Sequence, residues 1–306
     1  MSVKGTFRDG FATTTRGLDR QSPPYRLYQK AKRLGVWNPD DIDFSQDRAD
    51  WEMLNEGERD WVKQRLANFI AGEEAVTLDL LPLIKVVAME GRVEEEMFLT
   101  TFLFEEGKHM DFFTRYVEEV MQIDAAELGT FHSAPYKEIF HKRLPEALQA
   151  LEEDPSPLAQ VRASTIYNMF VEGVAAEAGY NSWFMALRGS RNLLPGMQEG
   201  ITLIKRDESR HIGFGVYFLS RHIVADPSML EVVEGMLEEL MPLLHALQDS
   251  GEDRDQANSF EFDYAASRAF TNRQYQKRIK RIQRAKGATM ESLYKWTNQI
   301  IEDDDG

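Results

Sequence analysis

The chain of 306 residues contains no cysteine. This absence excludes disulfide bonds, zinc–thiolate and iron–sulfur sites, thiolate haem ligation and a cysteine nucleophile. Any metal ion must therefore be bound mainly by His, Asp and Glu side chains. Runs of eighteen apolar residues are missing too, because charged residues or glycine interrupt the most hydrophobic windows, at 78–87 and 212–219. We expect no transmembrane segment and, since residues 1–33 lack the apolar core of a secretory signal, a cytoplasmic protein.

Basic residues are scarce in the chain as a whole. Lys and Arg number 36 against 51 Asp and Glu, which gives a formal net charge of −15 at pH 7. An acidic surface repels phosphate backbones, so we expect no nucleic-acid partner. The hydrophobic fraction of 42% and the charged fraction of 28% are ordinary for a globular chain and exclude general disorder.

One segment near the C-terminus departs from this acidic character. Six basic residues lie close together there: Lys277, Arg278, Lys280, Arg281, Arg284 and Lys286. Such a run is most often the solvated face of a helix, and contact with an anionic lipid or partner is the alternative. The acidic end of the chain, residues 302–305, is interpreted as a frayed terminus.

Alternating β-branched residues are also absent, and apolar residues instead recur at helical spacing from Trp51 onward. Pro145 is expected to interrupt a short segment, while Ser156 and Pro157 are predicted as the N-cap and the first residue of a helix. The predicted helices lie at about 25–34, 54–91, 92–128, 156–189, 196–225, 229–251 and 258–286. We therefore predict an all-α protein built on a long helical bundle. Its single domain comprises an N-terminal arm with a short helix at 1–50, the bundle at 51–250, and a C-terminal helix and acidic tail at 251–306.

Three of the six histidines follow a glutamate by three residues: Glu106/His109, Glu138/His141 and Glu208/His211. On a helix this spacing places a carboxylate and an imidazole on one face, where both can reach a single cation. Because acidic residues make up one sixth of the chain, about one such pairing is expected by chance. A single pair is therefore weak evidence for a metal site.

The order of the glutamates along the chain is more specific. Glu73 precedes Glu106 by 33 residues, and Glu172 precedes Glu208 by 36 residues, so a lone glutamate followed by Glu-x-x-His occurs twice. Four helices that supply four carboxylates and two imidazoles form the ligand set of ferritin-like dimetal bundles. Two cations would compensate the buried negative charge, and these donors suit Mn or Fe. We expect one ion at Glu73, Glu106 and His109 and the other at Glu172, Glu208 and His211, with carboxylates bridging them.

Each choice of ligand has an alternative. Glu73 and Glu172 taken singly are ordinary surface acids, but both lie in apolar surroundings that do not resemble a solvated face. The motif Glu138/His141 lies on a short segment between prolines and among basic residues, so we predict that it is no metal site. Three acids are adjacent to the chosen ligands and are alternative ligands: Glu74, Glu105 and Asp207. Only the repeated three-residue spacing from glutamate to histidine favours Glu106 and Glu208.

At these residues the chain resembles the ribonucleotide reductase small-subunit superfamily, and within it the ligand-binding oxidases that carry a mixed manganese–iron centre. The resemblance runs from residue 37 to about 244, and its most specific pieces are 71–77 (AGEEAVT), 105–109 (EEGKH), 167–173 (YNMFVEG) and 207–211 (DESRH). Reductase subunits usually place a radical tyrosine four residues after the first ligand histidine, where this chain has Phe113, but manganese–iron reductase subunits have phenylalanine there too. The oxidases are similar in having a valine three residues after the first glutamate and a tyrosine five before the third, here Val76 and Tyr167.

The resemblance implies a ferritin-like bundle with extra flanking helices and a homodimeric oxidase that activates dioxygen. It further implies a Mn/Fe cofactor, with di-iron as an alternative, and two-electron oxidation of a long-chain fatty acid or similar hydrophobic ligand that reaches the metals through an apolar tunnel. Val76 and Tyr167 would become joined by an ether bond. Tyr180 resembles a second tyrosine near the site, and Trp37 with Asp207 resembles a pair that carries electrons to the metals; alternatively, Asp207 only orients a ligand histidine.

Three points remain open at this stage. Small residues near the ligands, namely Gly72, Gly173, Ala175, Ala176 and Ala178, are consistent with room for an alkyl chain and equally with close helix packing. A radical-generating reductase small subunit is the first alternative function, although it would need a tail tyrosine and none follows Tyr294. A ferritin-like metal-binding protein is the second, but it would give Val76 and Tyr167 no purpose.

Overall fold

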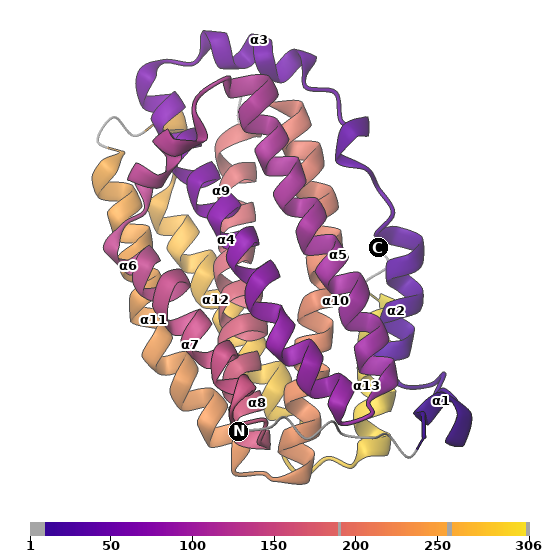
Figure 1. Ribbon diagram of the computed structural model, residues 1–306. Helices are drawn as coiled ribbons and strands as arrows, with labels where there is room; N and C mark the ends of the chain where they lie inside the picture. Colours follow the sequence, from indigo (N-terminus) through magenta and orange to yellow (C-terminus); the bar gives the residue numbers. More distant parts are fainter. Residues whose placement is uncertain (1–9, 189–190, 256–258, 304–306) are drawn as a thin grey trace, which may run out of the picture.

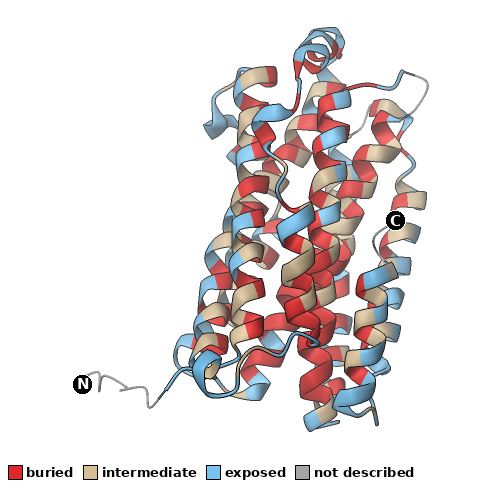
Figure 2. Cartoon of the chain, turned by 90° about the vertical axis from the view of Figure 1, so that its right-hand side faces the viewer, coloured by how far each residue is buried: buried red, intermediate tan, exposed pale blue. Residues whose placement is uncertain are grey.

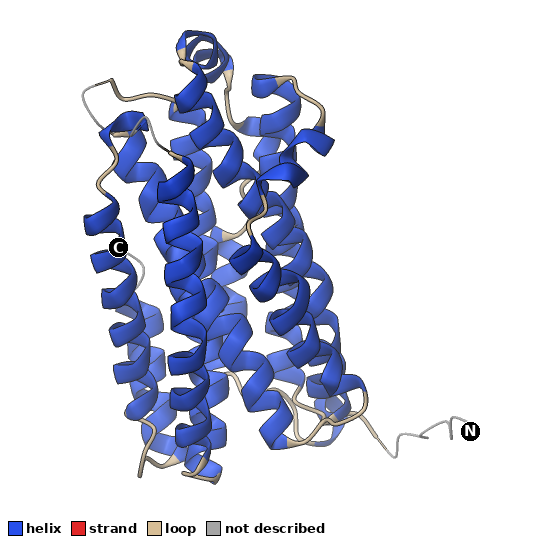
Figure 3. Ribbon diagram, turned by 90° about the vertical axis from the view of Figure 1, so that its left-hand side faces the viewer, coloured by secondary structure: helices blue, strands red, loops and turns tan. Residues whose placement is uncertain are grey.

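The computed structural model describes residues 10–188, 191–255 and 259–303. All regular structure in these ranges is helical, and no strand occurs among them (Figures 1 and 3). This confirms the all-α prediction. No helix in the described part of the chain is both long and apolar enough to cross a bilayer.

Long helices that run side by side form the body of the molecule (Figure 1). They are α4 (Glu56–Met89), α5 (Val93–Tyr116), α10 (Pro195–Ala225) and α11 (Met229–Arg254). A further continuous helical segment consists of α8 (Pro157–Ser164), the π-helical η6 (Thr165–Ala176) and α9 (Glu177–Leu187). At 1.5 Å per residue, the 34 residues of α4 extend for about 50 Å.

Shorter elements connect and flank these helices. Before the bundle come α1 (Ala12–Thr15), α2 (Pro23–Leu34), η1 (Pro39–Asp41) and α3 (Ser45–Met53). Between α5 and α8 lie η2 (Val117–Met121), η3 (Ala125–Phe131), α6 (Ala134–Lys137), η4 (Glu138–Arg143), α7 (Leu144–Gln149) and η5 (Ala150–Glu152). After α11 come η7 (Ser259–Glu261), α12 (Tyr264–Gln283) and α13 (Met290–Asp303).

Capping side chains fix where several of these helices begin. At the start of α4, Asn55 accepts a hydrogen bond from the backbone N–H of Glu58, and the Glu58 carboxylate accepts one from the backbone N–H of Asn55. Ser156 caps α8 and Pro157 occupies its first position, as predicted. The buried carboxylate of Asp47 on α3 accepts from two backbone N–H groups at the start of α10, which ties the N-terminal arm to the bundle.

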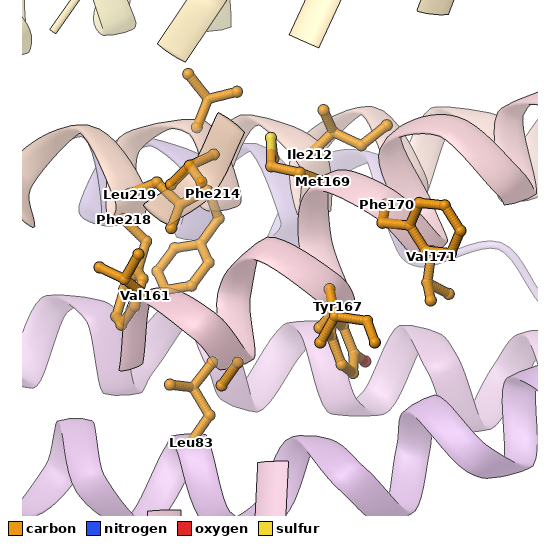
Figure 4. Close-up of a cluster of buried hydrophobic side chains, with 14 of the residues drawn as sticks. Leu83, Val161, Tyr167, Met169, Phe170, Val171, Ile212, Phe214, Phe218 and Leu219 are labelled. Atoms are coloured by element: carbon orange, nitrogen blue, oxygen red, sulfur yellow. The ribbon is translucent and has the colours of Figure 1, made fainter. Parts of the chain in front are cut away.

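Buried side chains line the inward faces of the helices along the length of the bundle (Figure 2). Around η6 the core is dense and apolar, and its buried members include Val161, Tyr167 and Met169 together with Phe214 and Phe218 of α10 (Figure 4). This packing surrounds a segment that also carries polar side chains, so it removes water from their neighbourhood.

The C-terminal part differs from the prediction in three ways. One helix was expected at 258–286, but the structure has α12 and then α13, whose Leu293 and Ile301 are buried. Residue 302 forms an ion pair with Arg26, so helical order continues into the segment expected to fray, and residues 304–306 lie outside the described part. Arg278 is only 2% exposed, which makes the solvated-face interpretation wrong for this member of the basic cluster. Outside the C-terminal part, Pro145 also differs from the prediction, because it occupies the first turn of α7 within continuous helix rather than breaking it.

Candidate metal centre

The structure brings all six predicted donor side chains together inside the bundle. Each of four helical segments contributes: Glu73 from α4, Glu106 and His109 from α5, Glu172 from η6, and Glu208 and His211 from α10. All six side chains are buried. Their meeting follows from the repeated spacing, because each half of the repeat places one carboxylate on one helix and a Glu-x-x-His pair on the next.

The donor atoms form two overlapping groups, each with its atoms within 4.8 Å of one another. The first group is Glu73, Glu106, His109 and Glu208; the second is Glu106, Glu172, Glu208 and His211. Glu106 and Glu208 belong to both. Of the two Glu106 oxygens, Oε1 lies 3.0 Å from Nδ1 of His211 and Oε2 lies 3.6 Å from Nδ1 of His109. This carboxylate is therefore placed to bridge two adjacent cation positions.

The other nitrogen of each imidazole is bound by an acid from the opposite half of the repeat. His109 Nε2 lies 3.2 Å from Asp207, and His211 Nε2 lies 2.8 Å from Glu105. With the proton on Nε2, each ring donates to its acid and presents Nδ1 to the centre. Glu105 and Asp207 each stand directly before the glutamate of a Glu-x-x-His motif. The sequence therefore contained a signal for both residues, but the spacing of the motifs assigned them no role.

Two basic side chains and a tryptophan indole surround Glu105 and Asp207, the acids that bind the imidazoles. The Arg210 guanidinium donates to both Glu105 and Asp207. Lys108 Nζ and Trp37 Nε1 each lie 2.8 Å from Oδ2 of Asp207. Although burial opposes ionisation, the hydrogen bond from His109 and the positive charges of His109, Arg210 and Lys108 lower the pKa of Asp207, so it remains a carboxylate.

The centre carries more buried negative charge than the protein alone stabilises. Burial raises the pKa of Glu73 to about 8 and the pKa of Glu172 well above its usual range, and neighbouring carboxylates add to both shifts. In the imidazoles burial acts in the opposite direction, but the surrounding carboxylates keep the pKa of both rings well above its ordinary value.

Buried atoms without hydrogen bonds are concentrated at the same place. Within the described residues, atoms that lack a partner include both carboxylate oxygens of Glu106, Glu172 Oε1, Glu208 Oε2, His109 Nδ1 and His211 Nδ1. A buried polar atom without a partner is costly, so this cluster fits metal ions rather than an empty polar core. Carboxylate oxygen combined with imidazole nitrogen is a donor set that suits Mn and Fe.

The π-helical geometry of η6 orients two of the predicted site residues. Tyr167 and Glu172 are five residues apart, which on an α-helix separates them by about 140°. Hydrogen bonds that close over five residues bring such positions onto nearly the same face. The Tyr167 hydroxyl donates to the backbone carbonyl of Val76, 3.0 Å away, so the predicted partners Val76 and Tyr167 are in contact.

An apolar cavity of about 140 Å³ opens beside the donor cluster. All four glutamates contribute to its wall together with Tyr180, whose hydroxyl lies 3.2 Å from Glu208. Most of the remaining wall is apolar, and its members include Phe69, Val76, Phe140, Val171, Leu244 and Leu247. Of the small residues that the sequence offered, Gly72, Ala175 and Ala176 line the cavity, whereas Gly173 and Ala178 do not.

Comparison with known proteins agrees with this geometry. The family model for the ribonucleotide reductase small chain matches residues 24–247. The chain belongs to this family. One similar solved structure is a valine-to-leucine variant of an R2-like ligand-binding oxidase with an anaerobically reconstituted Mn/Fe cofactor. The two sequences are 40% identical, the TM-score is 0.84, and the match covers 90% of this chain and 99% of that one.

A second solved structure extends the comparison. It is a glycine-to-leucine variant of an R2-like ligand-binding oxidase with a Mn/Fe cofactor, 39% identical at a TM-score of 0.85 and with the same coverage of both chains. These similarities confirm the predicted superfamily, its ferritin-like fold and the likeness to the R2-like ligand-binding oxidases.

The sequence singled out two further aromatic positions near the ligands, Phe113 and Tyr180. Phe113, where reductase subunits usually have the radical tyrosine, is fully buried and stacks on Phe69 at a centroid distance of 5.2 Å. Tyr180 is the tyrosine whose hydroxyl does reach the centre, since it contacts Glu208 and lies 3.5 Å from Glu73.

A residue outside the matched range contacts the backbone next to one of the donors. Arg278 of α12 donates from Nε to the backbone carbonyl of Gly173, 2.9 Å away, immediately after Glu172. A Cβ atom at Gly173 would lie 3.1 Å from that nitrogen, so glycine permits this close approach. The basic cluster gave no signal for this contact, because its spacing does not distinguish a buried arginine from five solvated neighbours.

The remaining histidines lie away from the donor cluster. His141 is exposed, and neither it nor Glu138 belongs to the two donor groups found in the described part of the chain. Trp37 stacks near His109, with ring centroids 6.3 Å apart, and donates to Asp207 as described above.

Proposed function

We propose that this protein is a dioxygen-dependent oxidase with one Mn and one Fe ion. The two overlapping donor groups, buried and open to an apolar cavity, are the observation that carries the proposal. Glu73, Glu106 and His109 would bind one ion, and Glu172, Glu208 and His211 the other, with Glu106 and Glu208 shared. When bound, such a metal pair supplies dioxygen activation and two-electron oxidation.

The relatives support the choice of metals. They are named as oxidases with Mn/Fe cofactors, and one solved structure holds a non-activated Mn/Mn cofactor after aerobic reconstitution with Mn and Fe. In this chain the protein's own contribution is to fix the donors. Asp207 and Glu105 keep both imidazoles in one orientation, and Trp37 with Asp207 offers a hydrogen-bonded route for electrons toward His109.

The ligand in this proposal is a long-chain fatty acid or a similar hydrophobic acid. Its carboxylate would replace water at the metal pair while its chain occupies the apolar cavity. Phe69, Phe140 and Leu244 would exclude water from the reacting region. A dry site strengthens the electrostatic interactions between the metal pair and the bound acid.

The proposal includes an ether bond between Val76 and Tyr167. The bond would join the Tyr167 phenol oxygen to Cβ of Val76, and one C–H and one O–H bond would break. Dioxygen takes up the two electrons and two protons released. The hydrogen bond from the Tyr167 hydroxyl to the Val76 backbone carbonyl supports this pairing, because it holds the phenol oxygen close to residue 76.

Metal loading under air tests both the metal centre and the ether bond. Apo-protein supplied with Mn and Fe should retain about two ions per chain and lose two hydrogens, with Val76 and Tyr167 in one linked peptide by mass spectrometry. Anaerobic loading and Tyr167→Phe should bind metal without the mass loss. Failure to retain metal would reject the oxidase, whereas metal binding without any mass loss would reject the ether bond alone.

A homodimer and a cytoplasmic location complete the proposal as predictions from the sequence. Leu78, Leu81 and Met89 of α4 and Phe104 of α5 are exposed large apolar side chains, with Leu78 and Phe104 both 62% exposed. Contact between two copies through this face would remove these side chains from water. Light scattering should give the mass of a dimer, and Leu78→Glu should shift it toward a monomer.

A further inference from the structure

The cavity wall has a second polar region, on α4 and away from the carboxylates. Arg65 and Asn68 both line the cavity, eight and five residues before Glu73. At 1.5 Å per residue, Arg65 begins about 12 Å along the helix axis from Glu73. The wall between them is formed by Phe69 and Gly72, so an apolar stretch separates two polar regions.

Arg65 lines the cavity without forming an ion pair to any described residue, and its contacts are with neutral groups and aromatic rings. Its guanidinium carbon lies 3.3 Å from the ring centroid of Trp61, and its Nε lies 3.4 Å from the Ser182 hydroxyl. Among the described ion pairs, none includes Arg65. The Tyr264 hydroxyl forms a hydrogen bond with Arg65, and the Asp255 carboxylate, which attracts the cation, already accepts hydrogen bonds from that hydroxyl and from a backbone N–H. Removal from water lowers the pKa of Arg65 to about 10, which reflects how poorly this cation is solvated.

Asn68 adds a second unsatisfied group at the same place. Its side-chain Oδ1 is buried without a hydrogen-bond partner among the described residues, while its backbone carbonyl accepts from Tyr136. Rotation of the amide by 180° would present its NH₂ group instead. Arg65 and Asn68 together therefore offer several N–H donors to whatever occupies this end of the cavity.

We propose that the cavity selects a chain with a carboxylate at the end remote from the metal centre, that is, a dicarboxylic acid. This inference rests on the proposed function, which places the first carboxylate at the metals. A plain alkyl end would leave the Arg65 cation without an anionic partner and would leave Asn68 Oδ1 without a hydrogen bond. A second carboxylate accepts hydrogen bonds from both and neutralises the cation.

Calorimetry with pairs of acids of equal length tests the proposal. The Mn/Fe-loaded protein, freed of co-purified lipid, is titrated with monocarboxylic and α,ω-dicarboxylic acids of ten to sixteen carbons. At the best chain length the dicarboxylic acid should bind at least roughly tenfold more tightly, as expected for one charge-assisted hydrogen bond. In Arg65→Met the ratio should fall to about one. Lys63→Met, which removes the same charge from the same helix outside the cavity wall, should keep the ratio of the natural protein.

Each other outcome counts against a defined part of the argument. Equal binding of the two acids at every length overturns the second carboxylate site and leaves the proposed oxidase intact. A ratio that persists in both Arg65→Met and Arg65→Gln also overturns it, and the second variant guards against a folding defect of the first. If neither acid binds the loaded protein, the fatty-acid part of the proposed function falls together with this inference.

Discussion

Replacement of Glu73 by glutamine should have opposite effects on the apo-protein and the metal-loaded protein. Without metal, Glu73 lies buried beside Glu106 and Glu208, and its pKa rises to about 8 because of burial, with the neighbouring carboxylates adding to the shift. Glutamine has nearly the same shape and no charge, so E73Q should stabilise the apo-protein. With metal bound, the same change removes a donor and should destabilise it.

The size of the effect follows from the pKa. An unfolded glutamate ionises near its ordinary value of 4.5, whereas folded Glu73 stays protonated up to about pH 8. The contribution of Glu73 to apo-protein stability is therefore fully present below pH 4.5 and is lost as the pH rises to 8. At pH 7 the loss is about 3 kcal/mol. Because E73Q also removes the 3.7 Å contact with His109, we expect a net gain of about 1–3 kcal/mol.

Urea unfolding of chelator-treated protein between pH 5 and pH 8.5 measures this gain. The difference between E73Q and the natural protein should grow with pH across this range. Glu74→Gln is the matched control, because Glu74 is the adjacent residue and is exposed, and its curve should follow that of the natural protein. An apo-form of E73Q that is less stable at pH 7, or a difference that does not change with pH, would refute the electrostatic reasoning.

Three further changes have defined outcomes. Glu105→Gln removes the charged partner of His211 and should weaken metal binding by about 10- to 100-fold in a metal titration, with little change in helix content. Arg278→Met leaves the Gly173 carbonyl without its donor and should lower the free energy of unfolding by about 1–3 kcal/mol and reduce metal occupancy, whereas the exposed Lys280→Met should change neither. Asn55→Ala removes the cap of α4 and should cost about 1 kcal/mol in thermal or urea unfolding without altering the metal spectrum.

The repeated spacing made the donor set predictable. Within each Glu-x-x-His pair, helix periodicity alone places the carboxylate and the imidazole on one face, so Glu106/His109 and Glu208/His211 needed no tertiary information. The N-cap of α8 at Ser156 was equally local. Such features depend on residues within one helical turn, which the sequence states directly.

Features that join distant segments could not be predicted in the same way. Glu105 was an unresolved neighbour of a ligand until the structure placed it against His211, 106 residues later. The contact between Arg278 and Gly173 spans 105 residues, and its partner is a backbone carbonyl with no signal of its own. The helix α13 was missed because its acidic end resembled a tail, although its buried face packs on α2 and α10.

The sequence by itself determined that the protein is helical and that two repeated sets of acids and imidazoles face inward, because both properties follow from periodicity along single helices. Only the tertiary structure decided which acid orients which imidazole, how a π-helix turns Tyr167 and Glu172 to one side, and where the cavity runs. These depend on the order and separation of helices in space, which arise when the whole core packs.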